Sequence, residues 1–254
     1  MGLAETFPPA PDYGTGVSRR RIRLTGEPRR VLGELEDNPH GMRCVVEHDG
    51  RKVTAVTSEF IRIPMTTCLS AGEPLKEIVG TPVGSDFSTF FRGGRARLNC
   101  THMFDLAWLA TAHAARGEMV RDYEIEVPDE VGGVPICARL RINGNVLLEW
   151  IISKAVIQSP EALRGRHLFQ GFTTWAVKHH EGDALEALLV LQKGCFVAQA
   201  RRFSAPPGAL GAAEKAVNTG LCHGFAAERI DVATRFGDNM RDFTQHPERL
   251  LKYQ

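Results

Sequence analysis

The feature that most constrains the fold is a series of short β-type runs joined by very short turns. The clearest turn is Asp49-Gly50, between runs at 42–48 and 52–57. This dipeptide readily takes the positive φ angles of a two-residue hairpin. One face of the first run is apolar and carries Met42, Cys44 and Val46. Because parallel strands need a crossover of about a dozen residues, these runs must pair antiparallel.

The same pattern occurs on both sides of this hairpin. Further strands are predicted over 17–24, 30–36, 120–127, 134–143 and 145–157, with Gly132-Gly133 and Asn143-Gly144-Asn145 as turns. The short turns and the absence of a GxGxxG or P-loop pattern argue against a Rossmann βαβ arrangement. The sequence therefore predicts an α+β fold, with an antiparallel sheet in one or two parts and helices packed on one side.

Two long helices are predicted. The first covers 101–115, where apolar residues recur at helical spacing and Gly117 follows the end. The second opens at Asp183, a candidate N-cap, and leads into an apolar run from Leu185 to Phe203. Shorter helices are expected near 73–79, 85–91, 209–218 and 225–236.

Composition sets the domain organisation and the class of protein. The chain has 254 residues, of which 43% are hydrophobic, enough for one substantial core. Residues 1–16 are rich in Pro and Gly and predict a flexible arm, or one that wraps a partner subunit. Residues 17–254 are predicted to form a single α+β domain. The arm and the long apolar helices favour a homo-oligomer, a dimer in the simplest case.

Charge and cysteine usage argue against several partners. The formal net charge is +1, which gives no general attraction to nucleic acid. The one basic run, Arg19-Arg20-Arg21 with Arg23, is interpreted as a solvated strand face. No stretch approaches the roughly 20 apolar residues of a membrane span, and the N-terminus lacks the pattern of a secretory signal. The six cysteines show no CxxC spacing, which favours a cytoplasmic protein with reduced thiols and no zinc cage.

The densest chemistry lies in Cys100-Thr-His-Met-Phe-Asp105, at the start of the first long helix. Thr101 is the predicted cap, and the partial positive charge of the helix N-terminus favours a neutral His102 that could act as a base or donor. Asp105, three residues on, could orient the imidazole ring, and the same dipole could lower the pKa of Cys100. The alternative is structural, because His102 could simply satisfy a buried carbonyl.

Lys154 is a second candidate, because it shares a face of an apolar strand with Trp150 and Ile152. A buried lysine must be paired or have its pKa shifted, which is one way to make a general base. The alternative is a strand-end lysine that reaches solvent. His102, Asp105 and Lys154 are the predicted catalytic residues. The residues expected to contact a substrate are Tyr13, Arg62, Cys100, Trp150 and His223.

No metal ligand set is predicted. His102 and His113 are three helical turns apart, too far to chelate one ion. The adjacent pair His179-His180 is expected in a polar surface loop. No motif for any other cofactor is present, so a cofactor-independent activity is expected.

An ordered set of residues carries a family resemblance. It consists of Arg19-Arg20-Arg21, Glu36-Asp37 with His40 nearby, Cys68 followed by Leu75 and Val79-Gly80, and Cys100-Thr101-His102 with Asp105-Leu106. In this order the chain resembles a bacterial family catalogued as domain of unknown function 2889. The hallmark of that family is Cys-Thr-His-Leu-x-x-Leu opening a helix, and Met103 stands here where Leu is common. The resemblance covers roughly 15–117 and extends more loosely to Cys222-His223-Gly224-Phe225 and Arg241-Asp242-Phe243.

The resemblance implies a neighbourhood of cofactor-free enzymes that degrade aromatic compounds, including a lyase that releases formaldehyde from lignin-derived phenylcoumarans. A phenolic substrate with a hydroxymethyl arm needs an apolar cavity, a base and donors for the phenolate. The first hypothesis is therefore a cofactor-independent lyase on an aromatic small molecule. The alternatives are an acyl-CoA thioesterase or hydratase and a non-catalytic ligand-binding protein.

Overall fold

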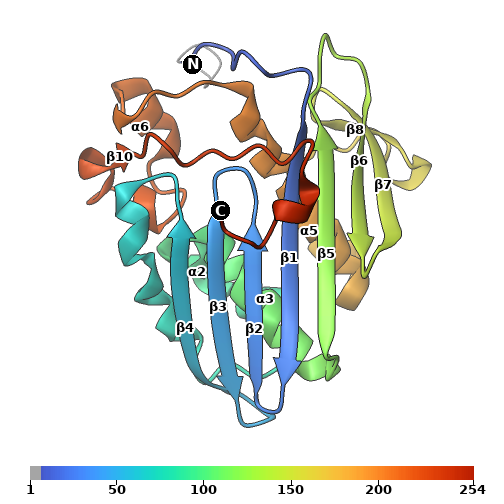
Figure 1. Cartoon of the computed structure of the whole chain (residues 1–254). Coiled ribbons are helices and arrows are strands. Elements are labelled where there is room, and N and C mark those ends of the chain that lie inside the picture. The colour runs from blue at the N-terminus through green and yellow to red at the C-terminus, as the bar shows by residue number, and fades with distance from the viewer. Residues whose placement is uncertain (1–6) are drawn as a thin grey trace.

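The chain is built on one antiparallel sheet with helices on one face (Figure 1). The computed structural model describes residues 7–254, and within them the sheet has eight strands in the order β4-β3-β2-β1-β5-β6-β7-β8. The strands are β1 (Val17–Glu27), β2 (Arg30–Glu36), β3 (Gly41–His48), β4 (Val53–Arg62), β5 (Val120–Pro128), β6 (Ile136–Ile142), β7 (Asn145–Ser153) and β8 (Val156–Ser159). The predicted α+β class is confirmed.

The two predicted strand sets are joined through β1. This strand pairs with β2 on one edge and with β5 on the other, so that Ile22 lies opposite both Leu35 and Tyr123. Alternate residues of β1 are buried, including Ile22 and Leu24. The apolar face of β3 is confirmed as well, since Met42, Cys44 and Val46 are fully buried.

Two long helices cover the same face of the sheet, α3 (Thr101–Arg116) over β1 to β3 and α5 (Gly182–Ala198) over β1 and β5 to β7. Figure 1 shows both behind the strands. Their side chains and the inner face of the sheet enclose one large apolar core. Within residues 7–254, no helix has the length and apolar character needed to cross a bilayer.

The shorter elements depart from the predictions. The described helices are α1 (Phe87–Phe90), α2 (Arg95–Leu98), α4 (Phe172–His179) and α6 (Ala212–Asn218), and a small ribbon pairs β9 (Gly208–Ala209) with β10 (Thr234–Arg235). The helix predicted over 225–236 is wrong, because that stretch holds two 3-10 turns and β10. Helix α4 was not predicted, and His179 ends it. The N-cap of α5 is Glu181, and Asp183 lies in the first turn.

The predicted strand over 145–157 is two strands. Lys154 and Ala155 have φ angles of 50° and 61° and form the hairpin turn between β7 and β8. Positive φ at both central residues is the requirement of a two-residue hairpin with a type I′ turn. This pair has no Asn or Gly to signal the turn, which is why the sequence predicts one continuous strand over 145–157.

The described part of the N-terminal arm, residues 7–16, lies against its own chain. Pro9 bridges to Phe203, and the Ala10 N–H donates to the carbonyl of Arg202. Gly14 and Gly16 donate from their backbone N–H groups to Asp129. The first six residues lie outside the described part of the chain.

Candidate active site

A cavity of about 410 Å³ opens at the N-terminal end of α3. We call it the outer cavity. Its polar and reactive lining residues include His40, Cys68, Cys100, His102, Lys193 and Cys222. Apolar side chains such as Met42, Ile63 and Phe196 form the rest of the wall. Small-molecule sites have this character, mostly apolar with a few convergent polar groups, and volumes of roughly 300–1,000 Å³.

The strongest polar feature of this cavity is a buried carboxylate–imidazole pair. Asp37 is fully buried and its Oδ1 lies 2.9 Å from Nδ1 of His40. Its Oδ2 accepts from the buried guanidinium of Arg20. Burial alone would raise the pKa of Asp37, but attraction to His40 and Arg20 and hydrogen bonds from His40 outweigh it, so this pKa is lowered.

The ionised state of Asp37 determines the tautomer of His40. A carboxylate only accepts hydrogen bonds, so Nδ1 of His40 must carry a proton. In the neutral ring, Nε2 is then the unprotonated nitrogen, available to take a proton from a ligand in the cavity. This arrangement has the geometry of a general base with an orienting partner.

The loop that carries His40 is held rigidly. The Asp37 N–H donates to the carbonyl of His40 at 2.9 Å, which closes the β2–β3 turn. Arg62, at the end of β4, donates to Glu36 Oε1 at 2.7 Å and to the carbonyl of Asp37 at 3.0 Å. Because Arg62 is buried and does not line the cavity, it serves to position the loop rather than to contact a ligand.

His102 lies beside His40, and the centroids of the two rings are 4.1 Å apart. Burial lowers the pKa of His102 well below its usual value, and the charges of His40 in its protonated form, of Arg20 and of Lys193 lower it further. The expected neutral imidazole agrees with this direction, although burial is its main cause. Nδ1 of His102 is buried and has no hydrogen-bond partner among residues 7–254.

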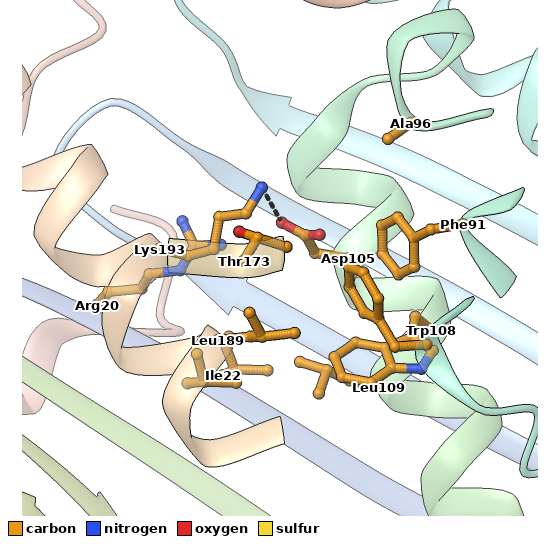
Figure 2. A pocket seen from close by; sticks show the side chains of 12 residues that line it. Arg20, Ile22, Phe91, Ala96, Asp105, Trp108, Leu109, Thr173, Leu189 and Lys193 are labelled. Carbon is orange, nitrogen blue, oxygen red and sulfur yellow. Dashed lines mark ion pairs between the residues drawn. The ribbon is translucent and has the colours of Figure 1, made fainter. Parts of the chain in front are cut away.

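The expected role of Asp105 as the partner of His102 is wrong. Its carboxylate faces Lys193 of α5, with Nζ and Oδ2 3.0 Å apart. Figure 2 shows the two side chains pointing toward one another. Asp105 therefore neutralises a cation on the facing helix.

Cys100 lines the outer cavity as a protonated thiol. It is itself the N-cap of α3, a position predicted for Thr101. Burial raises the pKa of its thiol to about 11, which outweighs the lowering effect of the first backbone N–H groups of the helix. The neighbouring thiols of Cys68 and Cys222 also have raised pKa values. All three are protonated at neutral pH and are poor nucleophiles.

A second cavity, of about 220 Å³, lies farther along the groove between α3 and α5. We call it the inner cavity (Figure 2). Phe87, Phe91 and Trp108 form one wall, and Arg20, Asp105 and Lys193 supply the polar groups. Thr173 and Lys193 line both cavities, so the two spaces adjoin at these residues.

The structure does not bring the other predicted residues into this site. Lys154 is exposed in the β7–β8 turn, where its backbone N–H donates to Glu130. Trp150 is fully buried in β7 against the ring of Phe172. Tyr13 lines a separate small pocket, and its hydroxyl accepts from the backbone of Glu130. The prediction that Lys154 is embedded in an apolar strand is wrong, because the chain reverses there.

His223 lies behind the cavity wall formed by its neighbours Cys222 and Gly224. Its Nε2 is 2.9 Å from the hydroxyl of Ser70, and its Nδ1 is 3.3 Å from the carbonyl of Leu98. Both ring nitrogens are therefore engaged with other parts of the chain, and His223 holds its segment against Ser70 and the end of α2.

Sequence reasoning missed His40 as a base, Asp37 as its partner, Arg20 and Lys193. Two signals were present. Asp37 and His40 are three residues apart at a strand end, and Gln192-Lys193 interrupts the apolar run of α5. A polar pair inside an otherwise apolar helix indicates a cavity or a paired charge.

No three His, Cys, Asp or Glu side chains within residues 7–254 are grouped so that they could hold a metal ion. Comparison with protein-family models finds no matching family, and comparison with curated proteins finds no match.

Proposed function

We propose that the protein is an acid–base enzyme acting on a small, largely apolar molecule in the outer cavity, with His40 as the base. The observation that supports it best is the Arg20–Asp37–His40 arrangement, with a buried ionised carboxylate behind an imidazole that lines an apolar cavity. Taking charged side chains out of water is costly for folding even when they are paired, so such an arrangement favours a functional role.

The reaction class we propose is cofactor-independent C–C cleavage of an aromatic compound with a hydroxymethyl arm, as in a phenylcoumaran. His40 Nε2 takes the proton of the arm hydroxyl, and the oxygen electron pair forms the C=O of formaldehyde as the C–C bond breaks. The released electron pair forms a C=C bond as the aryl ether opens, and the departing phenolate is protonated. The imidazolium of His40 returns its proton to that oxygen, and the neutral imidazole of His102 donates a hydrogen bond to the phenolate as it forms.

Charge placement favours this proposal over an acyl-CoA enzyme. A CoA ester carries phosphates, which need free basic side chains. Arg19 pairs with Glu126, and Arg21 and Arg23 both pair with Asp122. Each of the three is therefore already paired with a carboxylate of β5, although Asp122 serves two of them and Glu126 also pairs with Arg141, so none is free for a nucleotide phosphate.

The test is formaldehyde release from a phenylcoumaran with a free hydroxymethyl arm, measured for the wild type and for His40→Ala. General-base catalysis typically contributes a factor of about 100 to 10,000, so we expect kcat to fall by that range. His246→Ala is the matched control, because His246 is exposed and does not line the cavity.

The control variant is expected to keep wild-type turnover. Wild-type turnover in His40→Ala would contradict the assignment of the base. A wild-type protein that binds the compound and leaves it unchanged after prolonged incubation would favour a non-catalytic binding protein.

A further inference from the structure

The inner cavity has an aromatic wall of defined geometry. The rings of Phe87 and Phe91 stack at 4.1 Å, and Trp108 meets them edge-on at 5.4 and 5.8 Å. Aliphatic side chains, including Ile22, Leu109 and Leu189, line the cavity as well (Figure 2). Aromatic pairs prefer such stacked and edge-to-face arrangements, so this wall offers favourable contacts to one more ring.

Polar groups also line this cavity. Arg20 is buried, and its Nε has no hydrogen-bond partner among residues 7–254, although its Nη1 donates to Asp37. That nitrogen has almost no accessible surface, so a ligand oxygen in the cavity would instead be bound by Lys193 or Thr173, which also line it. Two cations, Arg20 and Lys193, are matched by two carboxylates, Asp37 and Asp105. The charges already balance, so a neutral oxygen fits better than an anion.

The inner cavity is connected to the proposed base through shared residues. Lys193 and Thr173 line both cavities, and Arg20 lines the inner one while its partner Asp37 holds His40 at the outer one. A ligand that fills both spaces would therefore place one part beside His40 and another against Trp108.

We propose that the inner cavity is a binding subsite for an aromatic ring with a neutral oxygen substituent, while the reacting part of the same ligand lies in the outer cavity. The role of the outer part rests on the proposed function. The inner volume of about 220 Å³ is sufficient, since an apolar cavity of about 150 Å³ can bind benzene. The substrate class is accordingly a compound with two linked rings.

Calorimetric titration with 4-benzylphenol, a stable two-ring probe, tests this assignment. Ala96 lines the inner cavity and is half-buried, so Ala96→Phe fills the cavity from its edge. We expect affinity to fall at least about tenfold, because a ring excluded from the subsite loses most of its apolar burial. Ala114→Phe is the matched control, at a half-buried alanine of α3 that lines neither cavity, and should stay within about twofold of wild type.

Two further proteins separate this inference from the proposed function. His40→Ala should bind 4-benzylphenol within about threefold of wild type even where turnover is lost, since the ring subsite does not depend on the base. Trp108→Leu, which removes a ring wall instead of filling space, should weaken binding about threefold or more. Unchanged affinity in both Ala96→Phe and Trp108→Leu, or no binding to the wild type, would overturn the subsite whatever His40 does.

The oxygen preference is tested with 1-benzyl-4-methylbenzene, which matches the probe in shape and lacks the hydroxyl. A hydrogen bond to a charged donor contributes enough to expect about tenfold weaker binding. Equal affinity of the two compounds would overturn the assignment of an oxygen-substituted ring.

Discussion

The buried charges at the His40 end of the β1–β4 half contrast with the exposed charge pairs on β6 and β7. In the β1–β4 half, Arg20, Asp37 and Arg62 are buried at one end of the strands. Arg20 donates to the carboxylate of Asp37, and Arg62 donates to the carbonyl of Asp37. On β6 and β7 of the other half, charges lie on the open face in cross-strand pairs, such as Arg139 with Glu149 at 2.6 Å, whereas β5 carries buried charges of its own, with Arg121 beside Glu186 of α5. The side chains of Arg139 and Glu149 remain 32% and 48% exposed.

This difference in the burial of charges distinguishes the candidate site from the part of the sheet that supports it. Taking charges out of water is costly, so a buried network is weak evidence for stability and better evidence for function. Exposed pairs are screened and contribute at most about 1 kcal/mol. Strands β6 and β7 supply core and support, whereas the β2–β3 turn of the other half presents His40 to the cavity.

The largest expected effect comes from breaking the buried network with Asp37→Asn. Removing the carboxylate leaves Arg20 buried without its partner, and loss of one member of such a pair destabilises by about 3–5 kcal/mol. The lowered pKa of Asp37 means that its contribution is present above the unfolded value of about 3.9 and is lost as pH falls through the folded pKa. Urea unfolding at pH 7 measures the loss. Asp238→Asn, at an exposed pair with Arg241, should change stability by less than about 1 kcal/mol, and equal effects would erase the contrast.

A smaller effect is expected for the contribution of His102 to the pH dependence of folding stability. Its folded pKa lies below the unfolded value of about 6.5, so the unfolded chain takes up a proton first and stability falls as pH decreases below 6.5. One such histidine contributes a slope of up to about 1.4 kcal/mol per pH unit. His102→Asn should flatten the stability profile between pH 7 and 5, leaving a residual slope from His113 and His223, whose pKa values are also lowered. The matched substitution His246→Asn removes an exposed imidazole and should keep the full slope; an unchanged slope in His102→Asn would contradict its buried neutral state.

The next substitution lies in the β5–β8 half and is expected to increase folding stability. Lys154 and Ala155 occupy a turn with positive φ at both positions, which suits Asn-Gly better. The double substitution Lys154→Asn, Ala155→Gly should stabilise the protein by about 0.5–1 kcal/mol, seen as a raised thermal midpoint, with turnover unchanged. Loss of turnover would restore Lys154 as a catalytic candidate.

The smallest effect is expected for Glu149→Ala. Its exposed pair with Arg139 should contribute no more than about 0.5–1 kcal/mol, further reduced at high salt. Unfolding at low and high ionic strength checks this. A loss comparable to that of Asp37→Asn would show that both halves carry structural charge networks.

Local sequence patterns predicted most of the sheet, because strand alternation and turn dipeptides are local properties. The limits of α3 were predicted to within one residue, since its apolar spacing and Gly117 are equally local. The joining of the two strand sets through β1 and β5 was not predictable, because that pairing connects residues about a hundred positions apart.

The site was predicted only in part, for a physical reason. His102 and Cys100 do line the outer cavity, yet their partners come from other elements. Arg20 was assigned to a solvated face with its neighbours, but its alternation with Ile22 and Leu24 places it inside, and only Asp37 at the end of another strand makes that burial tolerable. Such pairings depend on tertiary structure, which sequence spacing does not report.

The central claim is that Asp37 fixes the tautomer of His40 so that Nε2 serves the cavity. Long-range ¹H–¹⁵N NMR of the histidine rings, with and without 4-benzylphenol, tests it most directly. His40 is expected to be protonated at Nδ1 at neutral pH, and its Nε2 resonance is expected to shift when the probe binds. A ring protonated only at Nε2, or an Nε2 resonance that does not respond to the probe, would contradict it.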